Sequence, residues 1–167
     1  MKLWCLNFND FKEMALFHHW DREVPNDVAI ISINDGKDNL KETDEYHICQ
    51  TSENVLNLNF DDADPIANGL DSNITSYEYK GKTIEFFTDE QANEAIHFIE
   101  NNIKKSIFSN IHFFIHCSAG ISRSQAFVKY IKNIYNEINW ETNPNNPCLH
   151  PNGFVYQKLM NAYRCRK

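Results

Sequence analysis

The order of strand-like and helix-like segments predicts one α/β domain, with helices flanking a central, mostly parallel sheet of four to five strands. Residues 28–33, VAIISI, are a continuous apolar run rich in β-branched residues, as in a strand buried on both faces. Apolar residues in 92–103 recur at three- and four-residue intervals, as in an amphipathic helix. A hydrophobic segment at 111–115, IHFFI, then precedes another helical stretch. Such alternation favours a three-layer sandwich.

The remaining elements follow in chain order. We expect further strands over residues 2–8, 46–49 and 55–60, and helices over residues 11–19, 88–103, 122–135 and 154–164. Thr88 followed by Gln91 is typical of a capping box at the start of the second helix. Residues 65–82 are polar and include two glycines, so we expect a long loop or insertion there. Residues 140–150 contain two prolines and are expected to form a loop.

Length and composition indicate a single domain over residues 1–167, because 167 residues are few for two domains and no linker or repeat divides them. The net charge of −7 argues against nucleic acid and anionic membranes as partners. The five cysteines are odd in number and form no CxxC pair, which argues against a disulfide framework or a zinc site. The N-terminus is too polar for a signal peptide. We therefore expect a cytoplasmic monomer with reduced thiols.

The segment 111–127, IHFFIHCSAGISRSQAF, carries the chemistry. A strand ends at His116 and Cys117, a short loop of small residues follows, and Arg123 and Ser124 open a helix. Ligands of parallel sheets bind beyond the carboxyl ends of the strands, where this loop would lie. A loop curled around an anion would direct its backbone N–H groups and the N-terminus of the helix at that anion. Arg123 would add a planar fork for two phosphate oxygens, and the same positive field would favour the thiolate of Cys117.

This loop resembles the HCxxGxxRS signature of protein tyrosine and dual-specificity phosphatases, and the order of elements around it is similar to compact bacterial-type members. The resemblance implies that Cys117 attacks phosphorus and forms a phosphocysteine, with no metal or cofactor. Ser124 would stabilise the thiolate as a leaving group, and His116 would hold the loop and tune Cys117. The phosphate would be bound by Ser118, Ala119, Gly120, Ile121, Ser122 and Arg123.

In such a mechanism an aspartic acid protonates the leaving oxygen and then activates water. By resemblance to bacterial members with a Phe-x-Asp ending, Asp62 is the first choice and Asp61 the second, both just after the 55–60 strand. Asp64 is expected to be a solvated turn residue, and the same expectation holds for Asp61 if it is not the acid. The separation between Asp62 and Cys117 is longer than is usual for dual-specificity members, and the 65–82 insertion would account for it. If that segment does not loop out, Asp89 is the better acid.

Several alternatives remain at this point. The expected substrate is a phosphorylated protein, first on tyrosine and then on serine or threonine, or a small phosphomonoester. A phosphate-binding pseudophosphatase without turnover would use the same loop. Phosphoinositide and RNA 5′-phosphatase activities are disfavoured, since the loop has no lysine and the chain is acidic. Cys49 is taken as a buried thiol, with a protective disulfide to Cys117 as the alternative. The adjacent His18 and His19 are expected to be packing or surface residues rather than metal ligands.

Overall fold

The computed structural model describes residues 1–36, 48–105, 110–143 and 150–166. Five parallel strands form the main sheet in the order β3-β2-β6-β1-β7. Their bounds are β1 (Lys2–Asn7), β2 (Val28–Asn34), β3 (Val55–Asn59), β6 (His112–Cys117) and β7 (Glu141–Thr142). The predicted α/β fold with a mostly parallel central sheet is thus confirmed. The VAIISI segment is buried along its whole length because β2 lies between two other strands.

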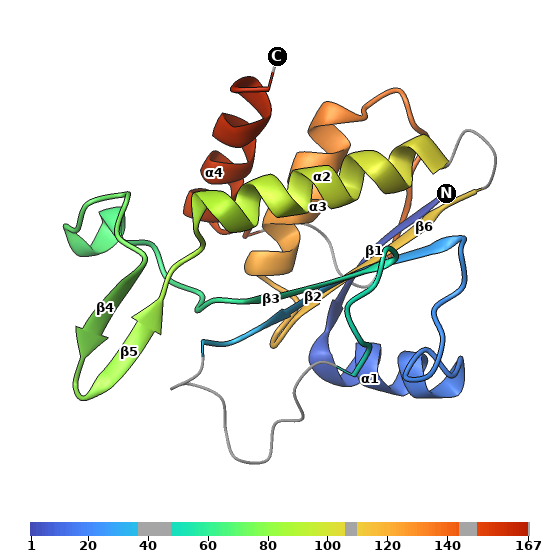
Figure 1. The fold of residues 1–167 in the computed structure, drawn as a ribbon, viewed down its shortest axis with the longest axis horizontal. Helices are drawn as coiled ribbons and strands as arrows, with labels where there is room; N and C mark the ends of the chain where they lie inside the picture. The colour runs from blue at the N-terminus through green and yellow to red at the C-terminus, as the bar shows by residue number, and fades with distance from the viewer. Residues whose placement is uncertain (37–47, 106–109, 144–149, 167) are drawn as a thin grey trace.

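Helices cover both faces of this sheet (Figure 1). α1 (Phe8–Phe17) lies on one face, where Phe11 and Ala15 pack with Val28, Ile30 and Phe114. α2 (Asp89–Lys105), α3 (Arg123–Ile134) and α4 (Gly153–Arg164) lie on the other face. The side chains of a strand alternate between faces, so the buried strands contribute to two separate hydrophobic clusters. This arrangement agrees with three layers.

The sheet register determines where functional side chains can meet. β6 pairs with β1 on one side and with β2 on the other, and Cys117 at its end lies opposite Asn7. All five strands run in the same direction, so their carboxyl ends share one edge of the sheet. The residues that follow β2, β3 and β6 are therefore brought to the same edge from distant parts of the chain.

The predicted loop over residues 65–82 is wrong in part. It contains a short 3₁₀ helix, η2 (Ile66–Asn68), and most of an antiparallel hairpin, β4 (Ser76–Tyr79) and β5 (Lys82–Glu85). The hairpin extends away from the main sheet (Figure 1). Lys80 and Gly81 form the turn of this hairpin. Their φ values are 51° and 78°, and a positive φ at both central residues is typical of the two-residue turns of hairpins. β4 is exposed throughout, so its alternating Tyr77 and Tyr79 do not face the core.

The other predicted elements lie close to those observed. The capping box of α2 is confirmed: Gln91 N donates to Thr88 Oγ1 at 3.2 Å, and Thr88 N donates to Gln91 Oε1 at 3.0 Å. The strand predicted at 46–49 falls partly outside the described residues, and residues 48 and 49 are not a strand. The predicted loop at 140–150 includes the two residues of β7, while 144–149 lie outside the described part. Among the described residues, no helix has the length and apolar character needed to cross a bilayer.

Candidate active site

The loop after β6 packs tightly against the start of the chain. Cys117 is the last residue of β6 and is 2% exposed. The next residue, Ser118, accepts a hydrogen bond through its carbonyl oxygen from Phe8 N at 3.2 Å. Gly120 has a φ of 68°, and a Cβ atom there would lie 2.7 Å from both Asn7 N and Leu6 C. Only glycine satisfies both the left-handed backbone and this close approach to β1.

The start of α3 brings a hydroxyl group to the sulfur of Cys117. α3 begins at Arg123, directly after the loop, so the first N–H groups of the helix are directed toward the loop. The Ser124 Oγ atom lies 3.2 Å from Cys117 Sγ. Ser124 is completely buried, so water does not compete for this contact. A hydroxyl in this position is able to donate a hydrogen bond to a thiolate.

Arg123 is buried at the carboxyl edge of the sheet, with 3% of its surface exposed. Its Nη1 donates to the carbonyl oxygens of Asn34, at 3.2 Å, and Phe60, at 2.6 Å. Its Nη2 donates to Ser118 Oγ at 3.1 Å and forms an ion pair with Asp35. Within the described residues, the buried Nε atom has no hydrogen-bond acceptor. Within the described residues, protein groups thus accept from both terminal nitrogens and Nε is the donor left for another acceptor, so the two-oxygen fork expected from the sequence is occupied.

Asp62 lies beside the loop, although it comes from a different part of the chain. Its Oδ1 accepts hydrogen bonds from Ser122 Oγ and from Asn152 Nδ2, both at 2.8 Å. Asn152 also donates its backbone N–H to Ser122 O at 3.0 Å, and its Oδ1 caps α4 through Val155 N at 3.0 Å. The loop after β3, the cysteine loop and the start of α4 therefore meet around one carboxylate oxygen.

Asp61, the second-choice acid, faces away from this arrangement. It is 7% exposed, and its carboxylate accepts hydrogen bonds from Gly36 N at 3.1 Å and Glu85 N at 2.8 Å. A Cβ atom on Gly36 would lie 2.6 Å from Asp61 Oδ2, so a larger residue there would displace this carboxylate. These contacts join the loops after β2 and β3 to the hairpin and give Asp61 a structural position.

The other two carboxylates considered above also have local partners. Asp64 Oδ1 accepts from Ile66 N at 2.9 Å, at the start of η2. Asp89 Oδ1 is 2.8 Å from Lys158 Nζ, which links the start of α2 to α4. Asp62 is therefore the aspartate among these four whose carboxylate contacts a side chain of the cysteine loop within the described residues.

His116 is completely buried on the opposite face of β6 from Cys117. Its Nε2 is 2.8 Å from Ser32 Oγ on β2, and its ring stacks on Phe11 of α1 with centroids 4.0 Å apart. These contacts fix the end of β6 between its neighbours. The loop-holding role expected for His116 would thus act through the position of the strand.

Three residues near the site were not recognised from the sequence. The Asp35 carboxylate contacts both Arg123 and Ser118 Oγ, the latter at 3.2 Å. Asn152 caps the start of α4 and donates to Asp62. Cys5 has its Sγ 3.0 Å from Ser124 Oγ. The position of Asp35 directly after a buried parallel strand was a usable signal, whereas Cys5 carried none.

Cys49 does not adjoin the loop. It is buried in the cluster on the α1 side of the sheet, whereas Cys117 packs in the cluster on the other side. Burial, and to a smaller extent the Asp21 carboxylate, raises the pKa of the Cys49 thiol from 9.0 to about 11. Cys5, Cys49, Cys117 and Cys165 are all free thiols, and Cys148 lies outside the described residues. In the described part of the chain, no group of three or more His, Cys, Asp or Glu side chains is arranged to hold a metal ion.

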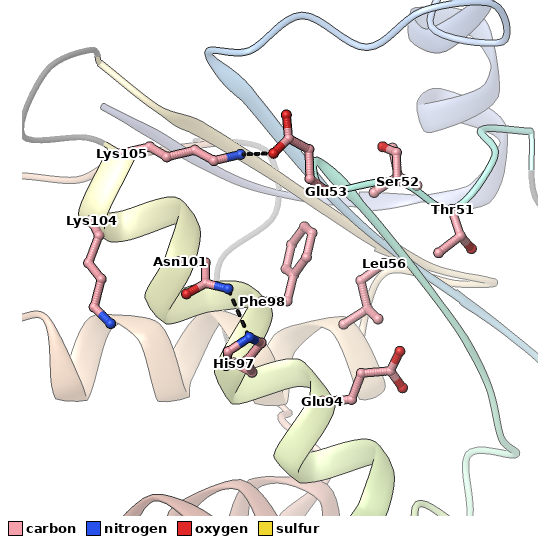
Figure 2. A pocket seen from close by; sticks show the side chains of 11 residues that line it. Thr51, Ser52, Glu53, Leu56, Glu94, His97, Phe98, Asn101, Lys104 and Lys105 are labelled. Carbon is pink, nitrogen blue, oxygen red and sulfur yellow. Dashed lines mark hydrogen bonds and ion pairs between the residues drawn. The ribbon is translucent and has the colours of Figure 1, made fainter.

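Two of the cavities in the described part of the chain bear on the position of the site. One, of about 620 Å³, lies between the β3 edge and α2, where Lys105 pairs with Glu53 at 3.3 Å and Asn101 contacts His97 (Figure 2). None of its lining residues belongs to the cysteine loop. The second, of about 550 Å³, is lined by Asp64 and Gly153, the close neighbours in sequence of Asp62 and Asn152. It therefore lies beside the candidate site and extends along α4.

No protein-family model, no curated protein and no solved structure matches this chain.

Proposed function

We propose that this protein is a cysteine-dependent phosphomonoesterase of the tyrosine or dual-specificity phosphatase type. The observation that carries the proposal is that a buried cysteine, Cys117, and a buried arginine, Arg123, lie at the two ends of one short loop. Arg123 keeps an Nε donor without an acceptor among the described residues, next to the N-terminus of α3. A buried cation with a vacant donor beside a helix N-terminus is suited to a tetrahedral oxyanion such as phosphate.

The first chemical step uses groups at the two sides of the loop. The Cys117 sulfur attacks phosphorus, the bond from phosphorus to the leaving oxygen breaks, and Asp62 gives that oxygen a proton. The hydrogen bonds from Ser122 and Asn152 both reach Oδ1 of Asp62, which leaves Oδ2 as the oxygen to carry the proton. In the second step Asp62 takes a proton from water, which attacks phosphorus and releases the Cys117 thiolate.

The substrates would be phosphorylated proteins or small phosphomonoesters, with phosphotyrosine first and phosphoserine or phosphothreonine second. Ile121 on the loop is 53% exposed, and it offers an apolar surface beside the phosphate position. An aromatic ring attached to the phosphate would cover this surface. The thiol chemistry requires a reducing compartment, for which we propose the cytoplasm.

The decisive experiment compares hydrolysis of para-nitrophenyl phosphate by the wild-type protein and the Cys117→Ser variant in the presence of EDTA. We expect metal-independent turnover that the substitution abolishes. A wild-type protein that binds phosphate or vanadate but shows no turnover would replace the proposal with a phosphate-recognition module. A wild-type protein that neither turns over nor binds would refute both.

A second comparison tests the assignment of the acid. Asp62→Asn should lower turnover of phosphotyrosine by about 10²–10⁴-fold, the usual contribution of a general acid. The loss should be smaller for para-nitrophenyl phosphate, since nitrophenolate leaves with less need of a proton. Asp61→Asn is the matched control. It should lower stability, but its turnover of phosphotyrosine relative to para-nitrophenyl phosphate should stay as in the wild type. The opposite pattern would assign the acid to Asp61.

A further inference from the structure

Cys5 lies directly behind the proposed nucleophile. It is located on β1, two residues before Asn7, the residue paired with Cys117 across the sheet. Its Sγ atom is 3.0 Å from Ser124 Oγ and 3.3 Å from Gly120 O. Ser124 Oγ in turn lies 3.2 Å from Cys117 Sγ. The three side chains thus form a chain of contacts from β1 through α3 to the end of β6.

The donors in this chain have a defined direction when Cys117 is ionised. A thiolate has no proton, so the hydroxyl of Ser124 must donate to it. Since that hydroxyl has a single proton, its contact with Cys5 must then be made by an oxygen lone pair. The Cys5 thiol is therefore the donor to Ser124. The other acceptor of Cys5, the Gly120 carbonyl, also accepts from Gln125 Nε2 at 3.2 Å and keeps that donor.

We propose that Cys5 is a positioning residue that donates to Ser124 Oγ and thereby directs the Ser124 hydroxyl at the sulfur of Cys117. The proposal rests on the proposed phosphatase function. When water attacks the phosphocysteine, the phosphorus–sulfur bond breaks and its electron pair goes to sulfur, while the proton of water goes to Asp62. The hydroxyl of Ser124 already points at the sulfur that receives this charge, so no reorientation is needed.

Burial strengthens this arrangement. Cys5 is 4% exposed, Ser124 is fully buried and Cys117 is 2% exposed, so water does not replace the hydrogen bonds. Hydrogen bonds in such a chain polarise one another, because a donor to the Ser124 oxygen makes its own O–H a better donor. A residue that only filled space behind Ser124 would not have this effect on the ionisation of Cys117.

The test is a double-mutant cycle read by the ionisation of Cys117. The pH dependence of its alkylation by iodoacetamide is followed by peptide mass spectrometry in wild type, Cys5→Ala, Ser124→Ala and the double variant. We expect Cys5→Ala to move the midpoint to higher pH by about 0.3–1 unit. This is a two- to tenfold decrease in the acid dissociation constant of Cys117, the size expected for loss of one net hydrogen bond. Cys5→Ser, which keeps a donor of shorter reach, should move it less. In the Ser124→Ala background, Cys5→Ala should cause no further shift.

The same variants are then compared in turnover of para-nitrophenyl phosphate. Cys5→Ala should slow breakdown of the phosphocysteine and increase the initial burst of nitrophenolate. Cys49→Ala is the control, because it removes a buried thiol that lies on the other side of the sheet. An unchanged alkylation midpoint in Cys5→Ala, or an equal shift with and without Ser124, would overturn the role of Cys5. Alkylation does not depend on turnover, so an inactive wild-type protein would refute the proposed function separately.

Discussion

Replacing Gly120 with alanine tests the close packing of the loop against β1. The substitution adds one methyl group where φ is 68° and where the new Cβ would lie 2.7 Å from Asn7 N and Leu6 C. Both neighbours are backbone atoms, and Asn7 and Leu6 are the last residues of β1, which is paired with β6. They cannot move aside as a flexible side chain would, so the loop itself must shift.

The expected loss of stability has two contributions. A left-handed backbone costs a non-glycine residue about 1–2 kcal/mol. Forcing a methyl group into filled space costs a further amount of about 1–3 kcal/mol. Gly69→Ala is a matched control, because Gly69 has a φ of 71° and nothing lies within 4 Å of a Cβ there. The difference between the two variants therefore isolates the contact with β1.

Urea unfolding of the two variants provides the measurement. We expect Gly120→Ala to lower the free energy of unfolding by about 1–3 kcal/mol more than Gly69→Ala, the contribution from overpacking. We also expect it to weaken binding of phosphate or vanadate, which Gly69→Ala should leave unchanged. Equal losses of stability in the two variants would refute the close approach of the loop to β1.

Three further predictions concern other contacts. Asp35→Asn should lower stability by about 1–2 kcal/mol, less than the loss of a fully buried ion pair, because Asp35 is partly exposed. Phosphate should then raise the melting temperature of this variant more than that of the wild type, since the anion replaces the charge lost beside Arg123. Unfolding free energy should fall by about 2 kcal/mol between pH 9 and 11 through Cys49, because the unfolded thiol ionises near 9.0 and the folded one at about 11. Thr88→Ala should cost about 1 kcal/mol through loss of the helix cap.

Each of these predictions has a control. For Asp35, an equal phosphate-dependent rise in melting temperature in variant and wild type would contradict the ion-pair argument. For Cys49, the Cys49→Ala protein should be less stable at neutral pH but flatter between pH 9 and 11, and an unchanged slope would refute the assignment. Tyr130 and Tyr135, whose pKa values burial also raises, contribute equally to both proteins. For Thr88, the Thr88→Ser variant should keep most of the stability, because it retains the hydroxyl.

Local patterns in the sequence were sufficient for the main elements of the fold. The uninterrupted apolar run of β2 predicted a strand covered on both faces, and the spacing of apolar residues predicted α2. The hydrogen bonds of the Thr88 cap join residues only three positions apart, so the local sequence is sufficient to predict them. The same holds for the loop from Cys117 to Arg123, which begins at a strand end and leads into a helix. The hairpin was not predicted because β4 is exposed throughout and only Ile84 of β5 packs against the main core.

The partners of the loop depend on the tertiary structure. Asp61 and Asp62 are adjacent and carry the same side chain. Asp61 nevertheless accepts from backbone N–H groups, whereas Asp62 accepts from the side chains of Ser122 and Asn152. The choice follows from alternation of side chains beyond β3 and from the position of the start of α4. Cys5 meets Ser124 only because β1 lies next to β6 in the sheet. Sequence alone determined which groups with useful chemistry are present, whereas the order of the parallel strands decided which of them meet, because contacts between distant segments depend on the register of the sheet.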